Sequence, residues 1–204
     1  MNRRKGMIIF GLLVILAVLL AISPQDIKLK LSTKAVYLHG AITWVSYIIF
    51  AVFGISGLAF LVTGKQWFFD LAARGHKVGT VFWVVNFMVW VPLSWYTWNT
   101  IFGEPRAKAS VWIMLCLGIV YLISQLIAGN KLMAGIYGSL GLGIWIYGLT
   151  AMGIISGSNR LLHPLDPIKT SPSSTIKLAY AGIYLTILLI AVILVFPPRK
   201  VKNN

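Results

Sequence analysis

The stretch from Lys34 to Trp44 reads K-A-V-Y-L-H-G-A-I-T-W and leads into an apolar run that continues to about Val62. A run of this length predicts a membrane-spanning helix, because the hydrocarbon core of a bilayer is about 30 Å thick and about 20 apolar residues cross it. His39 stands where the apolar run begins, at the depth where water gives way to lipid. Since a polar side chain at this depth is costly unless it has a role, His39 is a candidate functional residue.

Composition extends this interpretation to the whole chain. The 204 residues are 58% hydrophobic and 11% charged, and the mean hydropathy is +0.85, whereas soluble domains carry about 25% charged residues. The apolar runs lack the alternation of barrel strands. The sequence therefore predicts an all-α polytopic membrane protein, a six-helix bundle with both termini cytoplasmic, in which residues 1–204 form one integral membrane domain. The expected spans are residues 7–23, 36–62, 79–101, 110–128, 132–156 and 177–196.

The net charge of +14 is distributed singly or in small groups between the apolar runs. This pattern indicates anionic lipid headgroups rather than nucleic acid as partners. Of the 18 lysines and arginines, ten fall inside and eight outside in the expected topology, a bias of the sign that the positive-inside rule requires. We therefore expect a multi-pass protein of the cell (cytoplasmic) membrane. Its first helix is expected to be retained, because no A-x-A-like cleavage site follows it.

Other features exclude or disfavour several classes of site. The only cysteine, Cys116, excludes an intrachain disulfide, a CxxC redox pair and a C-x-x-C-H haem attachment site. No expected span contains an internal ionisable side chain, which disfavours an ion or proton transporter.

His76 falls in an expected inner loop, residues 64–77, which reads as an amphipathic interfacial stretch, and we interpret it as a solvated loop histidine. The glycines of the fifth span are assigned to helix packing rather than to a phosphate loop: Gly135, Gly138, Gly141, Gly143, Gly148 and Gly153.

Two of the three histidines share a face in this topology. His39 and His163 lie on the outer side, whereas His76 lies on the inner side. Two imidazoles are the minimum for bis-histidine ligation of one haem iron, so a non-covalent haem b at the outer face is one interpretation. Outer basic side chains would then meet the propionates, and Trp95 and Trp98 would offer flat apolar surface. The alternative interpretation is an ordinary aromatic belt with interfacial histidines.

The order and spacing of these features resemble the CcmC-type haem-handling proteins of the cytochrome c assembly (CcmC/CcsA) superfamily. Y-L-H-G-A-I-T-W, residues 37–44, is similar to that family's Y-L-H-x-P-x-x-W helix start, and L-L-H-P, residues 161–164, resembles its second haem histidine. The similarity covers roughly residues 34–190. The implied site has His39 and His163 as iron ligands, Lys34 and Arg106 at the propionates, and Trp44, Trp95, Trp98 and Phe102 along the haem plane.

The chain departs from the family in its tryptophan-rich signature. The family has W-G-x-W-W-x-W-D followed by an arginine, whereas this chain reads W-N-T-I-F-G-E-P-R from Trp98 to Arg106. Most of the tryptophans of that signature are missing here. The resemblance therefore supports haem binding better than it supports haem delivery to an acceptor.

Two functions are compatible with this resemblance. The first is a haem-binding protein of cytochrome c maturation that is not an enzyme. It would hold haem at the outer membrane face and pass it to a haem chaperone or apocytochrome c, beside other membrane subunits of an ABC-type or redox complex. The alternative is a membrane subunit of a respiratory or redox complex that keeps the fold and at most one b-type haem, which the eroded tryptophan motif favours.

Overall fold

The computed structural model describes residues 3–26, 30–99, 105–127, 130–151 and 171–196. Within these residues the chain forms six α-helices and no strand, and each helix is long and apolar enough to cross a membrane. The prediction of an all-α fold built from six apolar helices is therefore confirmed. The helices are α1 (Arg3–Ile22), α2 (Ser32–Thr63), α3 (Gln66–Trp98), α4 (Pro105–Leu126), α5 (Asn130–Ala151) and α6 (Ser174–Val195).

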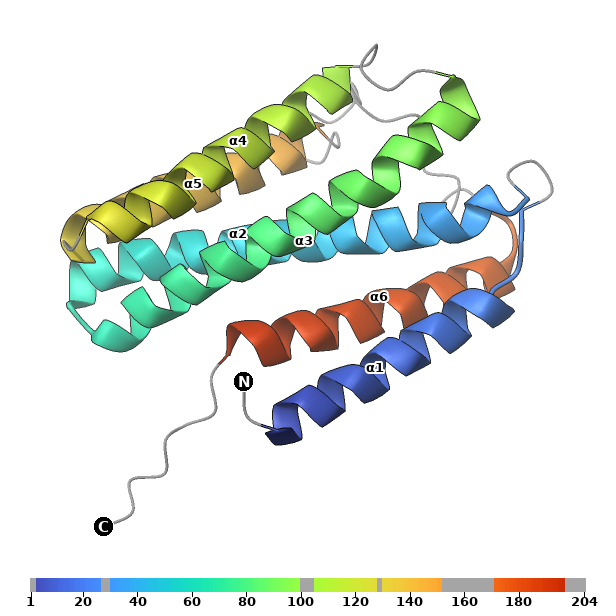
Figure 1. The fold of residues 1–204 in the computed structure, drawn as a ribbon, viewed down its shortest axis with the longest axis horizontal. Coiled ribbons are helices and arrows are strands. Elements are labelled where there is room, and N and C mark those ends of the chain that lie inside the picture. The colour runs from blue at the N-terminus through green and yellow to red at the C-terminus, as the bar shows by residue number, and fades with distance from the viewer. Residues whose placement is uncertain (1–2, 27–29, 100–104, 128–129, 152–170, 197–204) are drawn as a thin grey trace.

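Consecutive helices run in opposite directions, and the two longest, α2 and α3, lie at the centre (Figure 1). Helices α4 and α5 lie on one side of this pair, and α6 and α1 lie on the other. One end of the bundle gathers the starts of α2, α4 and α6 and is called the His39 end. The opposite end contains the α2–α3 connection and is called the Lys65 end.

Helix α1 is peripheral. It has no buried residue and packs mainly against α6. Its start lies beside the end of α6 (Figure 1), where Nζ of Lys5 donates to the carbonyl oxygens of Ile193 at 2.9 Å and Phe196 at 3.1 Å. These are carbonyls of the last helical turn, which have no intrahelical donor, so Lys5 acts as a cap for α6.

Glycines allow α2 and α5 to approach backbone to backbone. A Cβ atom on Gly57 would lie 2.5 Å from the carbonyl oxygen of Ala134, and one on Gly141 would lie 2.6 Å from that of Phe50. Only a hydrogen atom fits at such positions. The packing role predicted for the glycines of α5 is thus confirmed for Gly141, and it holds equally for Gly138 and Gly148, whose Cβ atoms would overlap α2 side chains.

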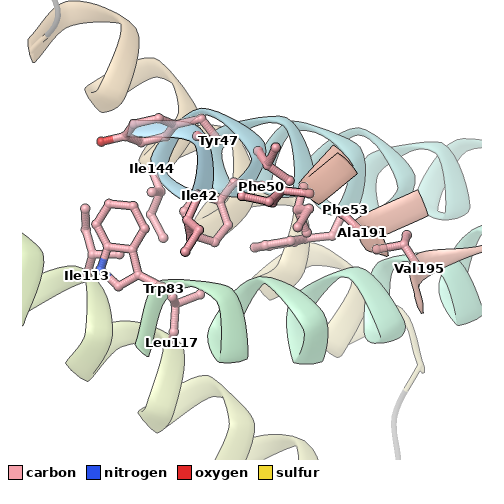
Figure 2. Close-up of a cluster of buried hydrophobic side chains, with 14 of the residues drawn as sticks. Ile42, Tyr47, Phe50, Phe53, Trp83, Ile113, Leu117, Ile144, Ala191 and Val195 are labelled. Atoms are coloured by element: carbon pink, nitrogen blue, oxygen red, sulfur yellow. The ribbon is translucent and has the colours of Figure 1, made fainter. Parts of the chain in front are cut away.

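A buried aromatic cluster fills the space between α2 and α3 (Figure 2). The ring of Phe50 lies 5.5 Å from that of Trp83 and 5.8 Å from that of Phe53, measured between centroids. The second of these contacts is edge-on, an arrangement that aromatic rings favour because of their quadrupoles. Leu117 of α4 and Ile144 of α5 close the cluster from the other side.

The α2–α3 connection is much shorter than predicted. Gly64 caps α2 in the left-handed conformation, with φ of 66°, and donates its N–H to the carbonyl of Phe60 at 2.8 Å. Helix α3 begins two residues later at Gln66, so the predicted loop at residues 64–77 is wrong. Its charges mimic a loop, but they occupy one face of a helix. The exposed residues are Asp70, Arg74 and Lys77, and the buried ones are Leu71, Ala72, Gly75 and His76.

Two helix starts follow familiar capping chemistry. Helix α4 begins at Pro105, five residues before the expected span, and proline is favoured at a first helical position because its missing N–H would have no partner there. Helix α6 is capped by Ser173, whose Oγ accepts from the N–H of Ile176 at 3.4 Å.

The glycine contacts give a direct test of the α2–α5 interface. Gly141→Ala should lower stability by about 1 to 3 kcal/mol, because its Cβ would meet backbone atoms that cannot move aside cheaply. Gly143→Ala is the matched control on the same helix, where a Cβ meets nothing within 4 Å, and it should be neutral or stabilising by up to about 1 kcal/mol. Thermal unfolding in detergent measures both. Equal midpoints for the two variants would contradict the close approach.

Candidate functional site

The turn of α2 that carries His39 lies between α3 and α6. The hydroxyl of Thr43, one turn further along, lies 2.8 Å from the carbonyl oxygen of His39 and 3.2 Å from Oδ1 of Asn86 on α3. It has one proton and donates to one of these oxygens at a time. On the α6 side, a Cβ on Gly40 would lie 3.4 Å from the hydroxyl of Tyr180. His39 itself is half-buried, with its Nδ1 atom enclosed by protein.

Tyrosines join the chain segments at this end. Tyr37 is fully buried, and its hydroxyl donates to the carbonyl of Pro24 at 3.0 Å, just beyond α1. Its ring centroid lies 6.4 Å from that of Tyr180. Tyr180 and Asn86 are neighbours of the His39 turn that the sequence did not predict. The isolated amide of Asn86 inside the apolar run V-V-N-F-M was the available signal.

The basic and aromatic residues predicted on α2 do not gather around His39 on one face. Residues five positions apart differ by about 140° around a helix, so Lys34, His39 and Trp44 project in three directions. Nζ of Lys34 donates to the carbonyl of Ala21 at 2.6 Å and so caps the end of α1. The side chain of Trp44 is half-buried.

The remaining predicted residues lie at or beyond the helix ends. Trp95 is in α3 near the His39 end, with 58% of its side chain exposed. Trp98 ends α3 and Arg106 lies in the first turn of α4, but their side chains fall outside the described part of the chain. Phe102 and His163 also lie outside the described residues.

The chemistry at His39 fits a haem better than a bare metal ion. The described residues contain no group of three or more histidine, cysteine, aspartate or glutamate side chains that could hold a metal. A haem brings four nitrogen ligands of its own and asks the protein only for axial ones, for which imidazole is a common choice. His39 offers an imidazole on the turn of α2 where Gly40 approaches Tyr180 of α6, and Trp95 is exposed near the same end of the bundle. Such aromatic side chains tolerate a partly hydrated environment.

His76 belongs to the protein core, and the interpretation of a solvated loop histidine is wrong. Its side chain has no exposed surface, and Nε2 lies 3.1 Å from the carbonyl oxygen of Leu117 on α4. Because a carbonyl only accepts, Nε2 carries the proton. The ring stacks on Tyr137 at 5.1 Å and meets the edge of Phe53 at 5.7 Å. Its Nδ1 atom is buried with no hydrogen-bond partner among the described residues.

His76 is one of two ring N–H donors that attach α4 to α3. Trp83, two turns along α3, donates from Nε1 to the carbonyl of Ser110 at 3.1 Å. The acceptors Ser110 and Leu117 are also two turns apart, so the two bonds form a ladder between antiparallel helices. Each carbonyl has a second lone pair besides the one that the helix uses. Helix α4 buries few of its own side chains, so these bonds matter for its position.

The expected absence of ionisable residues from the spans is wrong for α3. Its membrane-length segment, Gln66–Tyr96, includes His76 and three charged side chains: Asp70, Arg74 and Lys77. The charged three are exposed, and within the described ranges no carboxylate, lysine or arginine is buried. His76 therefore lacks the neighbouring charged groups that a continuous proton relay usually contains.

Comparison with models of known protein families finds no match, and comparison with curated proteins finds none either. The haem-handling resemblance therefore rests on the quoted residues around His39 and His163. It contributes to the function only as a proposal.

The buried position of His76 predicts a large effect of its removal. His76→Ala should cost about 2 to 4 kcal/mol of stability, because it opens a cavity beside Phe53 and Tyr137 and removes the donor to Leu117. Lys77→Ala, at the exposed neighbouring position, should stay within about 0.5 kcal/mol of the wild type. Thermal unfolding in detergent distinguishes them. A His76→Ala midpoint as high as that of Lys77→Ala would refute the buried contact.

Proposed function

We propose that this chain is a haem-binding membrane protein of cytochrome c maturation. It holds haem b non-covalently at the His39 end of the bundle, with His39 and His163 as axial ligands. The haem supplies an iron centre that imidazoles coordinate reversibly, and the chain itself carries out no covalent chemistry on a substrate. The haem is received from the outer leaflet and passed to a haem chaperone or apocytochrome c.

One observation carries this proposal: the chain segments that flank His163 converge on the same end of the bundle as His39. Helix α5 ends at Ala151 and α6 starts at Ser174, and both positions lie at the His39 end (Figure 1). The chain that connects these two helix ends includes His163, which supports the proposed pairing with His39. His76, by contrast, is enclosed in the core on the other half of α3.

The side chains around His39 suit a partly hydrated porphyrin. Trp95 is exposed near this end, and exposed tryptophan offers a flat apolar surface with one polar edge. Lys34 uses its ammonium group to cap α1, but an ammonium has three N–H donors, so two are left for a propionate. Arg106 follows in the first turn of α4, and a guanidinium can bind a carboxylate bidentately.

The proposed topology has both termini in the cytoplasm and the haem site on the extracytoplasmic face of the cell membrane. The basis is the excess of lysine and arginine assigned to the side of the Lys65 end. This orientation presents His39 and His163 on the side where cytochromes c receive their haem in the family that the sequence resembles. Partners on that side, and neighbouring membrane subunits of an ABC-type or redox complex, complete the proposal.

Absorption spectroscopy of the detergent-purified protein, oxidised and dithionite-reduced, tests the haem ligands. His39→Ala and His163→Ala should each abolish or shift the Soret band of the haem-loaded protein. His76→Gln is the control histidine variant, because glutamine can still donate to the carbonyl of Leu117, and its spectrum should match the wild type. If neither His39→Ala nor His163→Ala changed the spectrum, the ligand assignment would be wrong.

A competition measurement separates transient from resident haem. Excess apo haem protein should strip the Soret band from the wild type, because a handling protein must release its haem. A band that survives the challenge would indicate the alternative function, a redox-complex subunit with one resident b-type haem. The small number of aromatic residues between Trp98 and Arg106, compared with the pattern of the family that the sequence resembles, is the feature that favours this alternative.

A further inference from the structure

The exposed side of α3 changes from charged to apolar part way along the helix. Asp70, Arg74 and Lys77 are exposed near its start, whereas the exposed positions from Val81 onward are apolar. Taken alone, α3 would therefore place a membrane boundary near Arg74. The neighbouring helices place it elsewhere.

Helix α2 remains apolar well beyond the level of Arg74. A Cβ on Gly75 would meet Cβ of Phe53, and the rings of Phe60 and Phe69 lie 5.4 Å apart, so Arg74 is level with about Ile55. Helix α2 continues for about another 10 Å past that level, at 1.5 Å per residue. Of its exposed side chains there, only that of the last residue, Thr63, is polar. The others are apolar and end with Val62, which is 87% exposed: Ile55, Leu58, Leu61 and Val62.

Helix α4 shows the same offset on the other side of α3. The bond from His76 to the carbonyl of Leu117 makes Arg74 level with about Ile119. From there α4 runs on to Leu126, about 10 Å further. The exposed side chains of this stretch are mostly apolar or aromatic, with Gln125 in the last turn as the polar one: Tyr121, Leu122, Gln125 and Leu126. Arg74 and Lys77 therefore lie about 10 to 15 Å inside the ends of both neighbouring helices. We call these two side chains the recessed cations.

The recessed cations are compensated only in part by the described residues, because Asp70 is the only acidic side chain on the exposed side of α3 near them. Neither side chain has a hydrogen bond or ion pair with another described residue, and the nearby Asp70 accepts instead from Nε2 of Gln66 at 3.0 Å. A lipid-facing cation at such depth is costly, and even a side chain that reaches toward the interface shortens the distance only in part. An anionic group drawn into the recess would offset that cost.

We propose that Arg74 and Lys77 form a binding site for the phosphate of an anionic phospholipid in the leaflet at the Lys65 end. Arginine is suited to phosphate because its guanidinium donates two parallel N–H bonds, and lysine adds a point charge one turn away. With Asp70 close by, the local charge of the three side chains is +1, which one phosphodiester neutralises. The apolar surfaces of α2 and α4 on either side fit the acyl chains. This site is separate from the proposed haem site and does not depend on it.

Thermal unfolding with added lipid tests the proposal on the full chain in detergent. The probes are dioleoylphosphatidylglycerol, dioleoylphosphatidylcholine of equal chain length, and inorganic phosphate. The wild type should gain about 3 °C or more with phosphatidylglycerol only. The double variant Arg74→Gln/Lys77→Gln should lose this gain. The matched double variant Lys65→Gln/Lys131→Gln removes the same charge from exposed helix ends at the same end of the bundle, and it should keep it.

Native mass spectrometry gives a readout that does not depend on stability. The wild type should retain one more anionic lipid per chain than Arg74→Gln/Lys77→Gln after purification. Equal retention by all three proteins, or equal loss of the thermal gain in both double variants, would overturn the site in favour of general surface charge. Equal thermal gains with phosphatidylglycerol and phosphatidylcholine in the wild type would also overturn it. That result would favour an acidic side chain of a partner helix as the group that pairs with Arg74 and Lys77. A gain with inorganic phosphate alone would show that the recess binds the free anion rather than a lipid.

Discussion

The backbone contact between α2 and α5 is the constraint on which the rest of the bundle depends. In lipid, helices gain nothing from hiding apolar side chains from water, so close van der Waals contact has to hold them together. Gly57 and Gly141 provide that contact because no Cβ fits between the two helices at these positions. Once α2 is fixed on α5, its other sides are free to pack against α3 and α6. The position of His39 between those two helices follows from this arrangement.

The polar side chains inside the bundle have separate structural tasks. His76 and Trp83 use ring N–H groups to bind α4 through its main-chain carbonyls, which positions a helix that has little buried surface. Thr43 links α2 to Asn86 of α3 one turn below His39. Lys5 and Lys34 bind the last carbonyls of α6 and α1. Because each of these donors has a hydrogen-bond acceptor, it avoids the desolvation cost that an unpaired polar group would carry in the bilayer.

The two ends of the bundle differ in chemistry. The His39 end gathers tyrosine, tryptophan and one imidazole, which suits a flat, largely apolar ligand with a polar edge. The Lys65 end exposes cations on α3 at a level where α2 and α4 expose mainly apolar side chains, such as Ile55, Leu58 and Ile119. The proposed haem and lipid sites would use opposite ends of α2, α3 and α4 and different charged side chains, so binding at one would leave the other unobstructed.

The sequence by itself determined the fold class and the candidate ligands, because both depend on local signals. Apolar runs of membrane-spanning length predict helices wherever they occur, and the Y-L-H-G-A-I-T-W stretch marks His39 whatever its surroundings. The start of α3 and the role of His76 could not be predicted in this way. Charged residues from 65 to 77 read as a loop, since their alternation with buried positions makes sense only when α2, α4 and α5 are present to cover the other face.

The tertiary structure also decided which glycines matter and which side chains meet. Gly141 and Gly143 are alike in sequence, yet one touches α2 and the other faces open space, because helix rotation depends on packing rather than on composition. Likewise, the family resemblance implied one site for Lys34, His39 and Trp44, whereas a continuous helix separates them by rotation. Helix formation is encoded locally, but which faces touch is fixed only by contacts between residues far apart in the chain.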